Sequence, residues 1–359
     1  MLPKSIRVLV VDDSLVMRSL LRMVLASEPA IELAGMAADG VSALDAIHQL
    51  KPDLILLDIE MPHMNGLEVL AELRARSSRA KVIMCSTLTR RGAAITIEAL
   101  ARGATDYVMK PTAQRGAADA VATLSRELLP RIKALFPALQ HNDIHAIIPP
   151  TSDAFHGKHA EIVVIGVSTG GPAALETLLP RLPADFPIPI VIVQHMPRFF
   201  TSLLAERLNR ECALAVSEAA PAMRVQAGNV YIARGDWHLE LTKHAFGEGC
   251  ALRLSQAGAE HYCRPSVDML FRSAADAYRD AAIGVVLTGM GSDGLEGCKE
   301  IRNAGGRILV QDRATSAVWG MPGVVAEAGL AHRVLSLPAI AAELMRLCPA
   351  GISAFVSKG

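Results

Sequence analysis

Short apolar runs alternate with amphipathic helical stretches along most of the chain, and this alternation restricts the fold more than any other feature. Between Ile6 and about Lys133, strands are predicted for the runs IRVLVV, DLILLD, KVIMCS and DYVMKP. A second series begins at Glu161 with EIVVIGV and continues with IPIVIVQH, NVYIA, AIGVVLTG and GRILVQ. Repeated strand–helix units form parallel sheets that helices cover on both faces. The sequence therefore predicts a flavodoxin-like (βα)5 domain followed by a second α/β domain.

The segment PALQHNDIHAIIPPTSDAFHGKHA separates the two series and shows no sustained periodicity. We predict a first domain at residues 1–130, a linker at 131–159, a second domain at 160–350 and a tail at 351–359. The linker carries His141, His145, His156 and His159. Their spacing suits a metal site on a helix, but a solvated, proline-rich linker favours no such site.

Composition excludes several classes of partner. The chain of 359 residues has 36 basic and 36 acidic side chains, so its overall charge favours neither a nucleic acid nor an anionic membrane. No apolar run reaches the length of a membrane span, and the amino terminus does not resemble a secretory signal. The six cysteines include no C-x-x-C pair, as is typical of reduced thiols. We expect a cytoplasmic protein that binds no nucleic acid and does not insert into a membrane.

Acidic residues follow two strands of the first series. Asp12 and Asp13 end the first strand, and Asp58 ends the third. In a sheet ordered 2-1-3-4-5 these strands are neighbours, so three carboxylates would meet at one edge and would require a cation such as Mg²⁺. Lys110 ends the fifth strand with an opposing charge, and Ser86 ends the fourth with a hydroxyl group.

This set resembles the response-regulator receiver domains of two-component signalling over residues 5 to 130. The resemblance implies a phosphoacceptor at Asp58 that a histidine kinase phosphorylates, a Mg²⁺ site at Asp12, Asp13 and Asp58, a phosphoryl-binding Lys110, and switch residues Ser86 and Tyr107. Thr87 is the second candidate for the hydroxyl position. Acids at strand ends also cap helices, but the five positions together argue against capping alone.

The stretch IVVIGVSTGGP joins a strand to a helix through glycines. Its glycines do not fit G-x-G-x-x-G, and no lysine follows as in a Walker loop. Gly166, Ser168 and Gly170 fit G-x-S-x-G, in which small neighbours let a sharp turn project a serine nucleophile. A serine at this point can also serve only as a helix N-cap.

A serine nucleophile needs a base and a group that orients the base. His195 directly follows the strand IVIVQ, and Asp293 follows VVLTGMGS. A parallel sheet would present both residues beside Ser168. The sequence therefore predicts a Ser168–His195–Asp293 triad.

The segments VIGVSTGGP, VQHMP, RPSVDMLF and LTGMGSDG resemble the catalytic domain of the chemotaxis protein-glutamate methylesterases. The resemblance implies a doubly wound, mainly parallel domain, with Ser168 as nucleophile, His195 as general base and acid, and Asp293 orienting the imidazole. The chain order Ser, His, Asp differs from the α/β-hydrolase order. Backbone amides of Thr169 and Gly170 are candidate oxyanion donors, and the family suggests the Met290 amide as a third. No cofactor is expected for the esterase reaction.

The predicted function is a phosphorylation-activated methylesterase that hydrolyses glutamate γ-methyl esters on chemoreceptors and also deamidates glutamine. A receiver-controlled esterase, or a non-catalytic output module, of another sensory pathway is the alternative. A DNA-binding output is disfavoured because no helix-turn-helix pattern is evident. Arg264 is predicted either to border the substrate groove and meet acidic receptor surface, or to belong to an ordinary helix start. Tyr262 and Trp319 are candidate groove residues or core aromatics.

Overall fold

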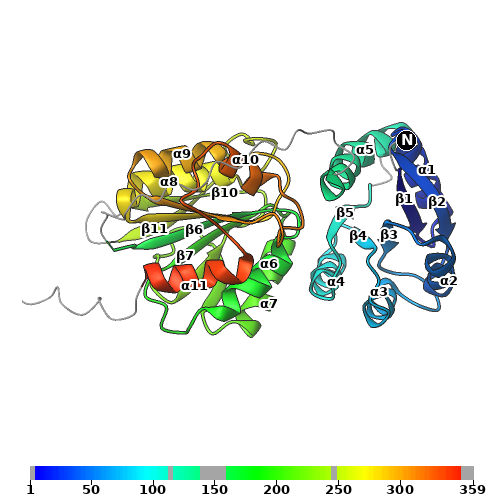
Figure 1. Ribbon diagram of the computed structural model, residues 1–359, viewed down its shortest axis with the longest axis horizontal. Helices are drawn as coiled ribbons and strands as arrows, with labels where there is room; N and C mark the ends of the chain where they lie inside the picture. Colours follow the sequence, from blue (N-terminus) through cyan, green and yellow to red (C-terminus); the bar gives the residue numbers. More distant parts are fainter. Residues whose placement is uncertain (1–4, 112–115, 138–158, 244–248, 349–359) are drawn as a thin grey trace, which may run out of the picture. The chain divides into compact units, whose positions relative to one another are not determined.

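The computed structural model describes residues 5–111, 116–137, 159–243 and 249–348. The chain divides into two compact units, Met1–Asp143 and Ile144–Gly359, which Figure 1 colours along the sequence. Most of the predicted linker, with His141, His145 and His156, lies outside the described residues, as does the predicted tail. The predicted boundaries therefore stay predictions.

The first unit alternates strands and helices, as the sequence predicts. Its elements are β1 (Ile6–Val11), α1 (Leu15–Ala26), β2 (Ile31–Ala37), α2 (Gly40–Leu50), β3 (Leu54–Asp58), α3 (Gly66–Ala75), β4 (Lys81–Ser86), α4 (Arg90–Ala101), β5 (Asp106–Met109) and α5 (Gly116–Leu135).

A five-stranded sheet of order β2-β1-β3-β4-β5 forms the centre of this unit, and all of its strand pairs are parallel. Helices α1 and α5 cover one face, and α2, α3 and α4 cover the other (Figure 1). Because both faces are covered, β3 is apolar up to its last residue and is buried throughout. The predicted flavodoxin-like fold is confirmed, and it places the ends of β1 and β3 side by side.

The second unit contains more strands than the sequence analysis predicts. Its elements are β6 (Ile162–Val167), α6 (Gly171–Leu178), η3 (Leu179–Arg181), β7 (Ile190–Gln194), α7 (Phe200–Glu211), β8 (Ala215–Glu218), β9 (Asn229–Ile232), β10 (His238–Lys243), β11 (Cys250–Ser255), α8 (Val267–Tyr278), η4 (Arg279–Ala281), β12 (Ala282–Val286), α9 (Leu295–Asn303), β13 (Arg307–Gln311), α10 (Met321–Glu327), β14 (Arg333–Leu335) and α11 (Leu337–Leu347).

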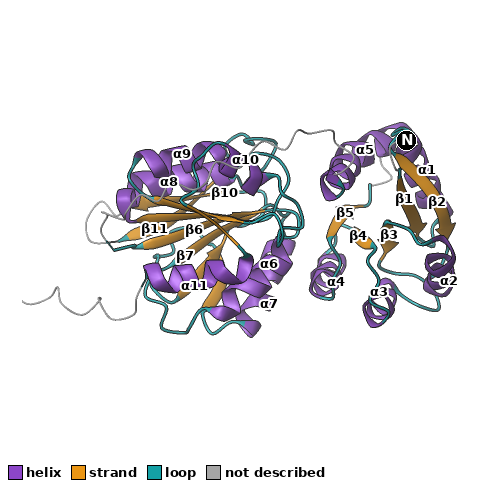
Figure 2. Cartoon of the chain, viewed as in Figure 1, coloured by secondary structure: helices purple, strands orange, loops and turns teal. Residues whose placement is uncertain are grey.

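Seven of these strands form one parallel sheet of order β14-β13-β12-β6-β7-β9-β8. Helices α8, α9 and α10 lie on one face and α6, α7 and α11 on the other, as Figures 1 and 2 show. The chain winds outward from β6 in one direction through β7 and in the other through β12. Ligands of doubly wound sheets bind where the winding direction changes, at the carboxyl ends of the strands. The predicted doubly wound α/β class is confirmed, and β6, β7 and β12 carry the candidate triad.

A two-stranded antiparallel hairpin, β10–β11, packs against α8 and lies outside the main sheet. His238 stands in β10, and its side chain is buried. Among the described residues, no helix is both long enough and apolar enough to span a membrane.

Candidate active site

The turn between β6 and α6 carries Ser168, and two glycines allow its shape. Gly170 has a φ of +77°, a region that side chains other than glycine rarely adopt, and a β-carbon added there would lie 2.5 Å from the Ala317 β-carbon. The loop after β12 approaches from the other side, so that a β-carbon on Gly289 would lie 2.8 Å from that of Ser168. The G-x-S-x-G pattern therefore reflects close packing around the serine.

Two neighbouring strands fix the backbone of this turn. The Gln194 side chain, at the end of β7, donates from Nε2 to the Ser168 carbonyl oxygen at 3.0 Å. Thr288, just after β12, accepts from the Ser168 amide at 3.0 Å and donates from Oγ1 to the Thr169 carbonyl at 2.9 Å. Ser168 is thereby held at the edge of the sheet where the winding direction changes.

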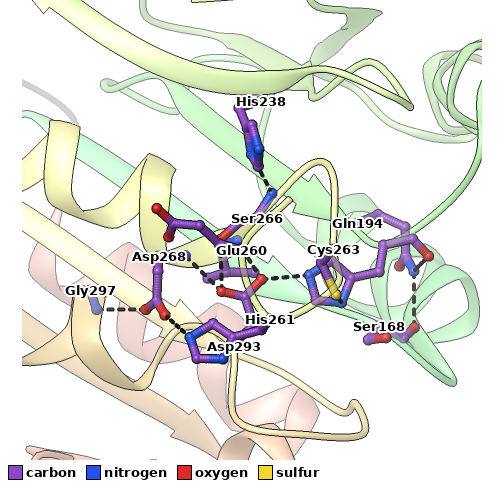
Figure 3. A network of polar contacts seen from close by, with 12 residues as sticks. Ser168, Gln194, His238, Glu260, His261, Cys263, Ser266, Asp268, Asp293 and Gly297 are labelled. Atoms are coloured by element: carbon purple, nitrogen blue, oxygen red, sulfur yellow. Dashed lines mark hydrogen bonds and ion pairs between the residues drawn. The ribbon is translucent and has the colours of Figure 1, made fainter. Parts of the chain in front are cut away.

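His195 and Asp293 form a direct pair, with His195 Nε2 2.8 Å from Asp293 Oδ2. The His195 side chain is 12% exposed and that of Asp293 is 3% exposed. The structure thus joins two residues that are 98 positions apart in the sequence. Figure 3 shows Asp293 within a polar network that includes Ser266 and Cys263, with Ser168 and Gln194 nearby.

The start of α8 anchors Asp293. Oδ1 accepts hydrogen bonds from Ser266 Oγ at 2.9 Å and from the Asp268 amide at 3.0 Å, and Oδ2 accepts one from the Val267 amide at 2.7 Å. Free amides at a helix start stabilise a negative charge. Burial alone would raise the pKa of Asp293, but the hydrogen bonds from His195 and the helix amides lower it to about 2. Asp293 is therefore an ionised acceptor with a fixed orientation.

An ionised acceptor fixes the tautomer of His195. Nε2 must carry the proton that it donates to Asp293, which leaves the lone pair of the neutral ring on Nδ1. Burial alone would lower the pKa of His195, but the Asp293 hydrogen bond and the neighbouring Cys263 raise it. Nδ1 faces Cys263 Sγ at 3.8 Å. Within the described residues, the Ser168 hydroxyl makes no hydrogen bond to His195.

The predicted oxyanion donors lie around Ser168. Thr169 and Gly170 directly precede α6, and Met290 follows Gly289 in the loop that packs against the serine. Among the described residues, the amides of Gly170 and Met290 donate no hydrogen bond to the protein. The Gly170 amide, at the start of α6, and the Met290 amide, in the loop after β12, are thus available to an oxygen atom of a ligand.

Three residues that contact the site were absent from the sequence-based assignment: Gln194, Cys263 and Ser266. Gln194 is adjacent to His195, and Ser266 lies within RPSVDMLF one residue before α8, so an N-cap pattern was a signal for it. His238 also supports this corner, because its Nδ1 accepts from the Ser266 amide at 3.2 Å. No pattern indicated Cys263.

The other residues considered for the groove differ in exposure. Tyr262 is fully exposed, whereas Trp319 is half-buried and pairs through its backbone with Gly289. Arg264 donates from Nη1 to the carbonyl oxygen of Ala257 at 3.1 Å. Arg264 therefore has a local backbone partner, and its contact with a receptor stays a prediction.

In the first unit, Lys110 bridges two of the predicted carboxylates. Its Nζ lies 2.8 Å from Asp12 Oδ2 and 2.7 Å from Asp58 Oδ1, and both acids are buried. Burial, opposed by Lys110 and reinforced by Asp12, raises the pKa of Asp58 to about 6. Lys110 therefore does not fully offset the burial of the Asp58 carboxylate and its repulsion by Asp12.

The same acids suit a divalent cation. Carboxylate oxygens of Asp12, Asp13 and Asp58 lie within 4.8 Å of one another. Asp12 Oδ2 pairs with Lys110 but accepts no hydrogen bond of good geometry among the described residues. A set of carboxylate oxygens with spare lone pairs is the chemistry that Mg²⁺ prefers.

The candidate switch residues are Ser86, the last residue of β4, and Tyr107, the second residue of β5. Ser86 is buried, and its Oγ accepts from Thr96 Oγ1 at 2.7 Å, whereas Thr87 is exposed. Tyr107 is buried in β5. Their roles stay predictions.

Comparison with known proteins gives the same division into two parts. The CheB methylesterase family model matches residues 163–344, and the response regulator receiver domain model matches residues 8–122. The protein-glutamate methylesterase/protein-glutamine glutaminase of Trichodesmium erythraeum is 44% identical over 95% of this chain and 98% of its own length. A protein of the same name from a Nocardioides species is 46% identical over 95% of each chain.

A solved structure also matches the second unit. The crystal structure of the Thermotoga maritima CheB methylesterase catalytic domain has a TM-score of 0.51 and 43% sequence identity, and the match covers 53% of this chain and all of that one. Taken with the two full-length relatives, this match shows that the chain belongs to the CheB methylesterase family, with a receiver domain preceding the methylesterase domain.

Proposed function

We propose that the chain hydrolyses glutamate γ-methyl esters on methylated chemoreceptors with Ser168 as nucleophile, His195 as general base and acid, and Asp293 as the residue that orients His195. One observation carries the proposal: a part-buried His195–Asp293 pair at 2.8 Å lies at the sheet edge where the tight glycine turn presents Ser168. The names of the full-length relatives support the choice of ester.

In the acylation step, the Ser168 oxygen attacks the γ-carbonyl carbon while His195 Nδ1 takes the hydroxyl proton. The imidazolium that forms carries protons on both nitrogens and is stabilised by the Asp293 carboxylate. His195 then gives the Nδ1 proton to the departing methoxide, so that methanol leaves. This ring orientation is the reverse of the chymotrypsin one, in which Nε2 faces the serine.

The negative charge on the tetrahedral oxygen requires donors that are already in place. The amides of Thr169, Gly170 and Met290 are our candidates, since they surround the serine turn. Loss of one such donor costs about two to three powers of ten in kcat in other enzymes.

Deacylation repeats the sequence with water in place of the serine hydroxyl. His195 removes a proton from the water and returns it to the serine oxygen, which leaves a free glutamate carboxylate. A glutamine side chain would form the same acyl-enzyme with ammonia as the leaving group. Deamidation is included in the proposal because both relatives also carry the name protein-glutamine glutaminase.

We assign control of this activity to the first unit, with Asp58 as the acceptor of a phosphoryl group from a histidine kinase. Asp12, Asp13 and Asp58 would hold Mg²⁺, which when bound neutralises the carboxylates and the incoming phosphoryl oxygens. Lys110, already within ion-pair distance of Asp58, would bind a phosphoryl oxygen, and Ser86 and Tyr107 would respond to the new charge.

The test is methanol release from a methylated receptor by the full-length protein. We expect Ser168→Ala to abolish release while leaving the fold intact, because only one hydroxyl is removed. Ser202→Ala is the matched control, since Ser202 lies on α7 and its hydroxyl donates to the Phe199 carbonyl. Equal release by the Ser168→Ala variant and the parent would overturn the assignment of the nucleophile.

A further inference from the structure

We propose that the catalytic centre also binds a soft divalent metal ion, Zn²⁺, between Nδ1 of His195 and Sγ of Cys263, and that the bound ion inhibits the enzyme. The binding site stands on geometry alone. Its inhibitory effect rests on the proposed function, because the metal would occupy the lone pair that the Ser168 proton needs.

The separation of the two donor atoms fits one zinc ion. Nδ1 and Sγ lie 3.8 Å apart. With bonds of about 2.1 Å to nitrogen and about 2.3 Å to sulfur, two ligands at tetrahedral angles are separated by about 3.6 Å. An ion placed between the atoms therefore requires a shift of only a few tenths of an ångström.

The histidine is already oriented as a metal ligand. Metal-bound imidazoles usually donate their other ring N–H to a carboxylate, which fixes the ring and increases its basicity. His195 donates Nε2–H to Asp293, and the start of α8 holds Asp293 in turn. In the neutral ring, the Nδ1 lone pair is consequently directed toward Cys263 before any ion arrives.

Hydrogen bonds and ion pairs also fix the loop that carries Cys263. Cys263 and Glu260 form an antiparallel bridge, with the Cys263 amide donating to the Glu260 carbonyl at 2.7 Å. An ion pair between Glu260 and Arg272 ties this loop to α8, and His261 Nε2 lies 3.1 Å from Asp268 Oδ2. The Cys263 side chain is half-buried, so its position is defined while solvent retains access.

The donor set distinguishes this site from the acidic site of the receiver domain. A thiolate and an imidazole select zinc and related ions, whereas the carboxylates of Asp12, Asp13 and Asp58 select Mg²⁺. On binding, the Cys263 thiol releases its proton to solvent, and a protonated His195 ring releases its Nδ1 proton as well. Nε2 of His195 keeps its own proton, and water completes the coordination. Binding is therefore expected to weaken as the pH falls.

The first test measures binding in the full-length protein with Co²⁺ as a spectroscopic substitute and excess Mg²⁺ present. A thiolate-to-cobalt charge-transfer band is expected in the parent and in Cys212→Ala, and is expected to vanish in Cys263→Ala. Cys212 is the matched control because it is also half-buried but lies elsewhere in the domain, directly after α7. A band that persists in Cys263→Ala, or that is absent from the parent, would overturn the proposal.

The second test measures Zn²⁺ inhibition of methanol release, with each variant compared with its own zinc-free rate. Removal of one of two protein ligands should raise the inhibitory concentration by at least about tenfold in Cys263→Ala, and not in Cys212→Ala. Equal inhibition of both variants would show that zinc acts elsewhere. The cobalt band does not depend on catalysis and should survive in Ser168→Ala, so failure of the methylesterase assignment would leave the metal site testable.

Discussion

At the scale of single residues, Asp293 is defined by four hydrogen bonds that come from His195, Ser266 and the first amides of α8. The sequence predicted the pairing of His195 with Asp293 because both follow strands of a parallel sheet. It did not predict Cys263 or Ser266 as contacts, since both lie in the segment between β11 and α8. Hydrophobic periodicity does not predict the course of such a connecting segment. The positions of Cys263 and Ser266 are therefore seen only in the structure.

We predict that Asp293→Asn lowers kcat/KM by about three to four powers of ten, which is less than the effect of Ser168→Ala. An amide facing Nε2 favours the wrong tautomer, in which Nδ1 carries the proton. Asp276→Asn is the control, because Asp276 is exposed on α8, the helix whose start anchors Asp293. Full activity of Asp293→Asn in methanol release would remove Asp293 from the mechanism.

The pH dependence of the parent enzyme follows from the raised pKa of His195. The base must be neutral, so activity rises with pH as His195 loses its proton. We expect the acidic limb of kcat/KM to lie above about 6.5, the ordinary histidine value, and to move to lower pH in Asp293→Asn. A limb that stays at the same pH in both proteins would contradict a His195 base coupled to Asp293.

We predict that Asp58→Asn stabilises the receiver domain at pH 7.5 without Mg²⁺. The folded pKa of Asp58, about 6, lies above its value of 3.8 when exposed, so its charge destabilises the fold as the pH rises through this window. The shift corresponds to at most about 3 kcal/mol in the free energy of unfolding. Excess Mg²⁺ should reduce or reverse the difference.

Urea unfolding followed by circular dichroism checks this prediction. Both tryptophans, Trp237 and Trp319, lie in the second unit, so their fluorescence should report an unfolding transition that Asp58→Asn leaves unchanged. If, without Mg²⁺, the receiver domain of Asp58→Asn were less stable than that of the parent, burial of the ionised Asp58 carboxylate would not destabilise the fold.

At the scale of elements, the apolar runs located the central strands, because strands covered on both faces must be continuously hydrophobic. The edge strands β8 and β14 were missed. They contain four and three residues, of which one in β8 and none in β14 is fully buried, and so they give no apolar run. The order of the first sheet, β2-β1-β3-β4-β5, is the one expected of a flavodoxin-like fold, although β2 was not among the four runs predicted as strands.

The turn between β6 and α6 can be tested with two glycine substitutions. Gly170 and Gly329 both have positive φ, but only at Gly170 would a β-carbon collide with a neighbour. We expect Gly329→Ala to cost about 1 kcal/mol in the free energy of unfolding, and Gly170→Ala to cost about 1–3 kcal/mol more and to impair methanol release. Tryptophan fluorescence in urea measures the stability. Equal stability and activity of the two variants would mean that the serine turn tolerates displacement.

At the scale of the whole molecule, a receiver domain and a methylesterase domain share one chain, and our proposal is that the first controls the second. We predict that a small phosphodonor with Mg²⁺ raises methanol release by the parent and by Asp45→Asn, whose substituted residue is exposed on α2. Asp58→Asn should not respond, because it lacks the acceptor carboxylate. A response in Asp58→Asn equal to that of the parent would place the phosphorylation elsewhere.

In the proposed mechanism, catalysis proceeds through an ester on Ser168. Cys263 is the strongest rival nucleophile because its sulfur faces Nδ1 of His195. The most direct measurement is acid quenching of the full-length enzyme during turnover of a methylated receptor peptide, followed by proteolysis and mass spectrometry. We expect a receptor glutamate joined through its γ-carbonyl to Ser168. Methanol release accompanied by a thioester on Cys263 and no adduct on Ser168 would contradict it.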